Sequence, residues 1–143
     1  MARVQDAAAY ILRQKGSMTA MKLQKLVYYA QAWSLVWDEQ PLFPERIEAW
    51  AMGPVSPDLY ELHRGSFRVS RLSQGDADAL TNTERETVDA IIDYYGCKSS
   101  HWLSDLTHRE APWKDARKGV APGARCHRVI THEAMAEYYD GLP

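Results

Sequence analysis

The strongest hydrophobic pattern of the chain lies between residues 20 and 38. Residues there recur at the i, i+3, i+4, i+7 spacing that forms one face of an α-helix. A helix that is apolar over more than half of its circumference needs neighbours on several sides, so we predict a central core helix over residues 20–38. The pattern consists of Leu23, Leu26, Val27, Ala30, Ser34 and Trp37, widened by Tyr28, Trp33 and Leu35, while Lys22, Lys25, Tyr29 and Gln31 fall on other faces.

Other amphipathic stretches and capping residues predict about six helices around this central one. Ser or Thr followed by Pro or by an acidic residue three positions later is typical of a helix N-terminus. Glycines that follow such stretches are typical of helix ends. We therefore predict a mainly α fold with a single domain over residues 1–143. The predicted helix starts are Val4, Ser56-Pro57, Thr81 or Thr83, Ser99 or Ser100, Trp113 (one or two turns) and Thr131.

The predicted β content is small. Residues 47–52 are short and partly alternating, and residues 67–70 form a second short stretch of strand-like composition. The first stretch also suits a buried coil, and Gly53-Pro54 ends it, because the residue before a proline is kept out of the helical region. We predict at most one two-stranded β element, formed by residues 47–52 and 67–70.

Charge is balanced, with 17 basic and 19 acidic residues and a pI near 6.2. This balance disfavours a protein whose main task is to bind nucleic acid, because phosphate binding depends on a surplus of Lys and Arg. The most basic window, residues 109–128, has acidic residues among its cations, and we interpret it as a solvated loop. No apolar run has the length of a membrane span and none resembles a secretory signal, so we expect a cytoplasmic protein without a membrane partner.

One cluster has the residue types of a catalytic or metal site. Asp105, His108 and Glu110 offer two carboxylates and an imidazole, which can bind a divalent ion or share a proton. Their spacing differs from the i, i+4 pair of zinc-binding helices, and polar groups at a helix end that bond the backbone are the commoner explanation. The chain has no P-loop, GxSxG or HExxH motif, and no residue is predicted to be a catalytic nucleophile.

The two cysteines form neither a CxxC motif nor a disulfide framework. Structural zinc sites pair their ligands at tight, repeated spacings, which the Cys and His residues of this chain lack. In the cytoplasm the thiols would stay reduced. We therefore predict neither a metal nor a cofactor. The residues considered for a zinc shell are Cys97, His101 and Cys126 with His127 or His132.

Two motifs carry a resemblance to a known family. The first is KLQKLVYYAQAW (residues 22–33), followed by PLF (residues 41–43) and EAWAMGPV (residues 48–55). The second is LTHREAPW (residues 106–113). In this order and spacing, the motifs resemble the Panacea-domain family, a prophage- and plasmid-associated group that includes GepA and the antitoxin SocA. The resemblance covers residues 5–140.

The resemblance implies a mainly helical domain that acts as the antitoxin of a two-gene toxin–antitoxin module. Such a domain binds and neutralises a cognate protein toxin by direct contact, and in SocA-like members it also delivers the toxin to a ClpXP-type protease. Larger members carry an added helix-turn-helix domain that this sequence lacks, so autoregulatory DNA binding is not expected. The alternative function is a small metal-dependent hydrolase centred on His108 and Glu110.

Exposed aromatic and Arg side chains are the expected binding hot spots of such an antitoxin. We expect most motif residues to have structural roles instead, with Trp113 in the core and His108 or Glu110 bonding the backbone. The candidate toxin-binding residues are Tyr29, Trp33, Trp37, Tyr60 and Arg64. The motif residues with predicted structural roles are Leu23, Leu26, Tyr28, Trp50, Gly53, Pro54, Thr107, His108, Glu110, Pro112 and Trp113.

Overall fold

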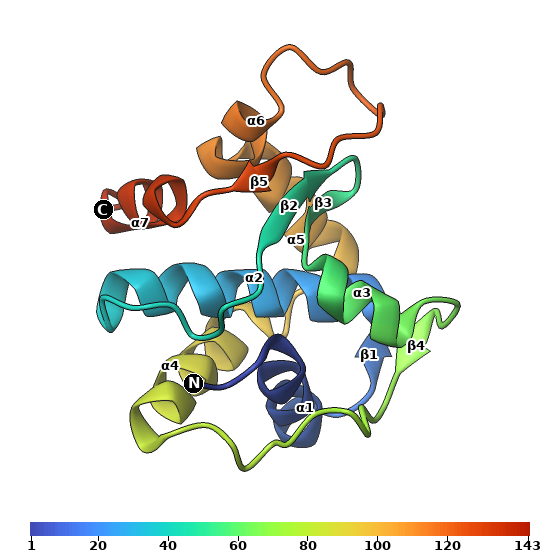
Figure 1. The fold of residues 1–143 in the computed structure, drawn as a ribbon, viewed down its shortest axis with the longest axis vertical. Coiled ribbons are helices and arrows are strands. Elements are labelled where there is room, and N and C mark those ends of the chain that lie inside the picture. Colours follow the sequence, from blue (N-terminus) through green and yellow to red (C-terminus); the bar gives the residue numbers. More distant parts are fainter.

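The computed structural model describes residues 1–143, and it is organised around helix α2 (Ala20–Trp37). The Thr19 hydroxyl caps this helix by accepting a hydrogen bond from the Lys22 N–H at 3.2 Å. Six further helices lie around α2, as Figure 1 shows. The predicted mainly α fold with a central helix is therefore confirmed. These helices are α1 (Val4–Lys15), α3 (Pro57–His63), α4 (Asn82–Tyr95), α5 (Ser100–Arg109), α6 (Ala111–Ala116) and α7 (His132–Asp140).

The predicted caps account for most of the helix starts. The exception is α6, which begins at Ala111 and not at the predicted Trp113, because Pro112 fits the first turn of a helix. Ser56 caps α3, Thr81 forms a capping box with Glu84 at the start of α4, and Ser99 caps α5. Each of these side chains accepts a hydrogen bond from an N–H of the first turn that would otherwise lack a partner. Thr131 caps α7 in the same way. Local capping chemistry thus decides where these helices begin.

Helix α2 is enclosed on nearly all sides. Helices α1, α4, α5 and α7 pack against it, together with strand β3 (Gly53–Val55). Lys25, Tyr29 and Gln31 are therefore fully or almost fully buried, although the hydrophobic pattern placed them on other faces than its apolar stripe. The Gln31 amide shows how such a polar group is accommodated, since it accepts a hydrogen bond from Leu42 N–H at 2.8 Å and donates one to the Phe43 carbonyl at 2.9 Å.

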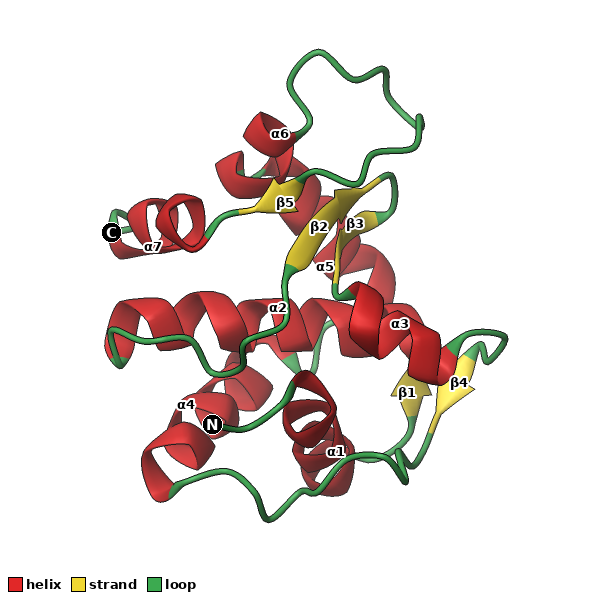
Figure 2. Cartoon of the chain, viewed as in Figure 1, coloured by secondary structure: helices red, strands yellow, loops and turns green.

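Two small antiparallel sheets accompany the helices (Figure 2). The larger sheet has the strand order β3-β2-β5, and the smaller sheet consists of β1 and β4. The strands are β1 (Met18–Thr19), β2 (Ile47–Trp50), β3 (Gly53–Val55), β4 (Arg68–Val69) and β5 (Val129–Ile130).

The predicted positions of strands near residues 47–52 and 67–70 are confirmed, but their predicted pairing is wrong. β2 pairs with β3 through a two-residue turn and with the distant β5, and β4 pairs with β1. The reason is α3, which follows β3 and carries the chain to the N-terminal end of α2. There the Ala20 N–H donates a hydrogen bond to the Phe67 carbonyl at 2.8 Å. Strands of two residues have no periodicity of their own, so the sequence could not show which pair forms.

None of the seven helices combines the length and the apolar composition that a membrane crossing requires.

Candidate protein-binding surface

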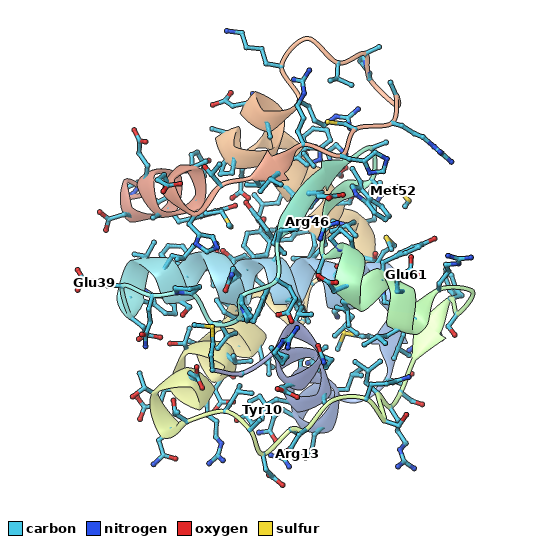
Figure 3. The ribbon with its side chains drawn as sticks, in the orientation of Figure 1. Tyr10, Arg13, Glu39, Arg46, Met52 and Glu61 are labelled. Carbon is cyan, nitrogen blue, oxygen red and sulfur yellow. The ribbon has the colours of Figure 1, made fainter.

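The β2–β3 hairpin presents Met52 to solvent. Ala51 and Met52 form its turn, and the Met52 side chain is 50% exposed (Figure 3). Gly53 follows with a φ of +125°, a backbone conformation that residues with a Cβ atom rarely adopt. An exposed methionine on a rigid turn supplies a flexible, polarisable apolar contact to a binding partner.

Side chains from α5, from α6 and from the residue that follows α6 hold the back of this hairpin. The Trp113 indole N–H donates a hydrogen bond to the Trp50 carbonyl at 2.8 Å, and the Arg117 guanidinium donates one to the Ala49 carbonyl at 3.0 Å. The His108 ring bonds the Ala51 carbonyl at 3.2 Å and also the Ser104 carbonyl. This geometry is consistent with the prediction that His108 bonds the backbone. The contacts of His108, Trp113 and Arg117 with the hairpin carbonyls also hold the turn that carries Met52.

Helix α3 provides the second side of the surface. The buried Gln24 amide of α2 accepts a hydrogen bond from Ser56 N–H at 2.9 Å and contacts the His63 ring at 2.9 Å, so both ends of α3 are tied to the core. Tyr60 then packs edge-on against Trp50, with ring centroids 5.0 Å apart. Tyr60 is half-buried, and its ring faces the same region as Met52.

Two grooves meet at Met52 and Tyr60, and we call them together the Met52 surface. The first groove, of about 360 Å³, continues toward the loop before β5, and the second, of about 460 Å³, runs between α3 and the start of α2. Phe67, which is 80% exposed, stands at the rim of the second groove. Besides Met52 and Tyr60, the first groove is lined by Trp50, Ala51, Arg125, Cys126 and His127, and the second by Thr19, Ala20, Met21, His63, Arg64, Gly65, Ser66, Phe67 and Ser100.

A buried carboxylate lies beside the first groove. Burial by itself would raise the pKa of Glu48, but hydrogen bonds from the Trp50 indole at 2.9 Å and from Arg46 at 2.7 Å outweigh this effect, and the pKa is lowered. His127 contacts the same carboxylate at 3.4 Å. Glu48 therefore remains ionised and orders the Trp50 ring.

A second buried carboxylate, Glu110, closes a tyrosine network in the core. Its Oε1 atom accepts hydrogen bonds from the Tyr29 hydroxyl at 2.7 Å and the Tyr139 hydroxyl at 2.8 Å, and Tyr139 contacts the Tyr28 hydroxyl at 3.0 Å. Burial raises the pKa of Glu110, although the two hydrogen bonds oppose this effect. Burial also raises the pKa of Tyr95, which stacks on Tyr29, to about 12.

Lys25 lies next to the hairpin, inside the fold. Its side chain is 1% exposed, and it makes no hydrogen bond or ion pair with another residue. A Cβ atom on Gly53 would come within 2.6 Å of Lys25 Cε, so the amine occupies the space that this glycine leaves open. Burial lowers the pKa of Lys25 to about 8. The periodicity of α2 did not predict that Lys25 is buried, because this residue lies outside the apolar stripe.

The family model of the antitoxin SocA-like Panacea domain matches residues 23–114. The chain belongs to this family. The match runs from α2 into α6 and includes the hairpin and α3, so both motifs that carried the resemblance, apart from Lys22, lie within it. An antitoxin role is the function that this family supports. Searches of curated proteins and of solved structures found no match.

The predicted toxin-binding residues of this Panacea domain do not form one surface. Tyr60 and Arg64 belong to the Met52 surface. Trp33 and Trp37 lie at the other end of α2, where their rings are 5.0 Å apart and only Trp37 is largely exposed. Tyr29 is fully buried, so its prediction as a surface residue is wrong, because α2 is covered on the side that carries it.

Most motif residues of this Panacea domain lie in the core or at the hairpin and the elements that support it, as expected for structural roles. Leu23, Leu26 and Tyr28 are in the core, and the Thr107 hydroxyl donates a hydrogen bond to the Ser104 carbonyl at 2.9 Å. Trp113 is only partly buried, and it supports the hairpin rather than filling the core centre. Glu110 bonds tyrosine hydroxyls and not the backbone, which corrects one of the two predicted alternatives. The remaining residues, Trp50, Gly53, Pro54 and Pro112, form the hairpin and the start of α6.

The structure does not bring the predicted metal ligands together. Asp105 pairs with His101 at 3.2 Å on the outside of α5, whereas His108 faces backbone carbonyls and Glu110 faces the tyrosines. No group of three or more His, Cys, Asp or Glu side chains is placed to hold a metal ion. Neither His108 nor Glu110 lines the two grooves of the Met52 surface.

Proposed function

We propose that this Panacea domain is an antitoxin that binds a cognate protein toxin directly and neutralises it through the Met52 surface. The observation that carries the proposal is the position of the family's first motif, which builds the hairpin and hence the surface. Exposed Met and Phe side chains, a half-buried Tyr and a nearby Arg are the residue types that dominate protein–protein interfaces.

Neutralisation in this proposal needs no chemical step. The toxin is occluded by contact, and its delivery to a ClpXP-type protease is an additional step that requires the same complex. We place the activity in the cytoplasm, where the free Cys97 and Cys126 thiols are compatible with the reducing conditions. The hydrolase alternative loses its geometric support, since its two central residues face different partners in the fold.

The test is co-expression with the product of the neighbouring reading frame. We expect that product to arrest growth when it is expressed alone and to be harmless when this chain is present, and we expect the two proteins to co-purify. If growth is not restored and no complex is recovered, the antitoxin proposal is wrong.

Met52→Glu is the variant that tests the surface. Because it places a charge at the junction of both grooves, we expect binding to the toxin to weaken by at least about 30-fold, which corresponds to about 2 kcal/mol at an interface hot spot. Isothermal titration calorimetry measures this change. Tyr94→Glu is the matched control, since Tyr94 is 64% exposed on α4 and lies outside the surface. Equal loss in both variants, or none in Met52→Glu, contradicts the assignment.

A further inference from the structure

Charged residues are distributed unequally among the grooves of the molecule. The charged residues that line the two grooves of the Met52 surface are Arg64 and Arg125, and no acidic residue lines them. Two other grooves lie along α7 and show the opposite composition. One contains Asp115 and Glu137, the other contains Glu39, Glu133, Glu137 and Asp140, and neither contains a basic residue.

The groove that contains Glu39 lies far from the Met52 surface. Figure 3 shows Met52 on the side of the hairpin and α3, and Glu39 beyond the far end of α2. The net charge of −2 therefore conceals a difference between the grooves, with arginines beside the exposed apolar side chains of the Met52 surface and carboxylates in the grooves along α7.

The cations of the Met52 surface are available to a partner. Arg125 is exposed and forms no ion pair. Arg64 contacts only Glu61, at 3.3 Å, and both side chains are about two-thirds exposed. Such exposed pairs contribute at most about 1 kcal/mol, so a partner's carboxylate can replace Glu61 at small cost. His63 adds no charge at neutral pH, because burial lowers its pKa.

We propose that the Met52 surface receives a segment of the toxin that is both apolar and acidic. Apolar side chains of that segment would lie against Met52, Tyr60 and Phe67, and its carboxylates would face Arg64 in one groove and Arg125 in the other. Complementary charge around an apolar centre directs encounter and fixes orientation, while the apolar contacts supply most of the affinity. This inference rests on the proposed antitoxin function and specifies the chemistry of its partner.

A random peptide library displayed on phage tests the inference without knowledge of the toxin. We expect peptides selected on the immobilised full chain to combine Asp or Glu with Leu, Phe, Tyr or Trp. We expect the synthetic peptides to bind Arg64→Glu/Arg125→Glu at least about 30-fold more weakly, and to lose affinity as salt rises, since exposed charges are screened. The matched control is Glu133→Lys/Asp140→Lys, which changes the charge of the α7 groove and should leave binding unchanged.

Three results would overturn the inference. The first is selection of basic, uncharged or no peptides, and the second is equal binding to Arg64→Glu/Arg125→Glu. The third is a dimer, seen by sedimentation velocity, that is disrupted both by Arg64→Glu/Arg125→Glu and by Glu133→Lys/Asp140→Lys. In that case a second copy of this chain would occupy the Met52 surface. Each result is separate from the growth assay. If growth is restored in co-expression but the selected peptides are not acidic, only this inference is rejected. If the selected peptides are acidic but growth is not restored, the antitoxin proposal is rejected.

Discussion

At the scale of single residues, Lys25 is the most unusual side chain of the molecule. An amine that is 1% exposed and has no hydrogen-bond or ion-pair partner must retain its charge without compensation or lose its proton. The lowered pKa of about 8 records this cost. At neutral pH, the buried charge of Lys25 therefore lowers the free energy of unfolding.

We expect Lys25→Met to raise the free energy of unfolding at pH 7 by up to about 3 kcal/mol, the linkage equivalent of a pKa that falls from 10.5 to about 8. The folded pKa lies below the unfolded one, so between pH 8 and 10.5 the unfolded chain holds the extra proton and the wild type gains stability as pH rises. The advantage of the variant should accordingly shrink by pH 10.

Urea unfolding of wild type and variant at pH 7 and pH 10 measures this difference. Lys15→Met provides the control, since Lys15 is exposed at the end of α1. A variant that is less stable than wild type at pH 7, with a gap independent of pH, would show that Lys25 is not an uncompensated charge.

At the scale of elements, the β2–β3 hairpin connects the family motif with the proposed function. Its two strands are short, and its shape depends on a turn that needs a positive φ at Gly53 and on support from α5 and α6. The sequence indicated that the strand ends at Gly53-Pro54, but these two residues begin β3 and the turn lies at Ala51 and Met52. A strand of three residues is too short for its own pattern to be recognised.

We expect Gly53→Ala to lower the free energy of unfolding by about 1–3 kcal/mol, because alanine is strained at a φ of +125°. The added Cβ would also approach Lys25 Cε at 2.6 Å, but a flexible side-chain end can move away. The loss should therefore persist in a Lys25→Ala background.

Thermal or urea unfolding of the two single variants and the double variant measures the coupling between Gly53 and Lys25. Gly141→Ala serves as the comparison, since Gly141 has a φ of −82° that alanine accepts. Its added Cβ would lie 3.3 Å from the Glu137 carbonyl oxygen, so we expect a smaller loss than for Gly53→Ala. Full recovery of stability in the double variant would mean that the contact with Lys25, and not the backbone, decides the effect.

At the scale of the whole molecule, the Glu110 network joins parts of the chain that are distant in sequence. Glu110 follows α5, Tyr29 belongs to α2, and Tyr139 belongs to α7, which lies outside the residues that match the family model. The carboxylate thus links the family's core to the C-terminal helix.

We expect Glu110→Ala to cost about 2–4 kcal/mol, since it leaves two buried tyrosine hydroxyls without an acceptor, and Glu110→Gln to cost less, since its amide oxygen can replace the carboxylate. The raised pKa of Glu110 predicts a stability contribution that is present below about pH 4.5 and is lost as pH rises through the folded value. Glu110→Gln should remove this pH dependence.

Unfolding curves between pH 4 and pH 8 distinguish these outcomes. A Glu110→Gln variant as unstable as Glu110→Ala, or one that keeps the full pH dependence of the wild type, would argue against the network as described.

The sequence by itself determined the helices and, apart from that of α6, their starts. Periodicity over 18 residues identified α2, and Thr81 and Ser56 marked helix starts, because capping and amphipathicity are local properties. The resemblance of the two motifs likewise identified the family that the comparison supports.

Only the tertiary structure decided how these elements meet. It buried Tyr29 and Lys25, paired β2 with β5 instead of with β4, and joined Met52 to Arg64 and Arg125 on one surface. Each of these outcomes depends on contacts between residues far apart in the chain. The exposure of a side chain and the pairing of a strand depend on which distant segments pack against it, and neither periodicity nor capping contains that information.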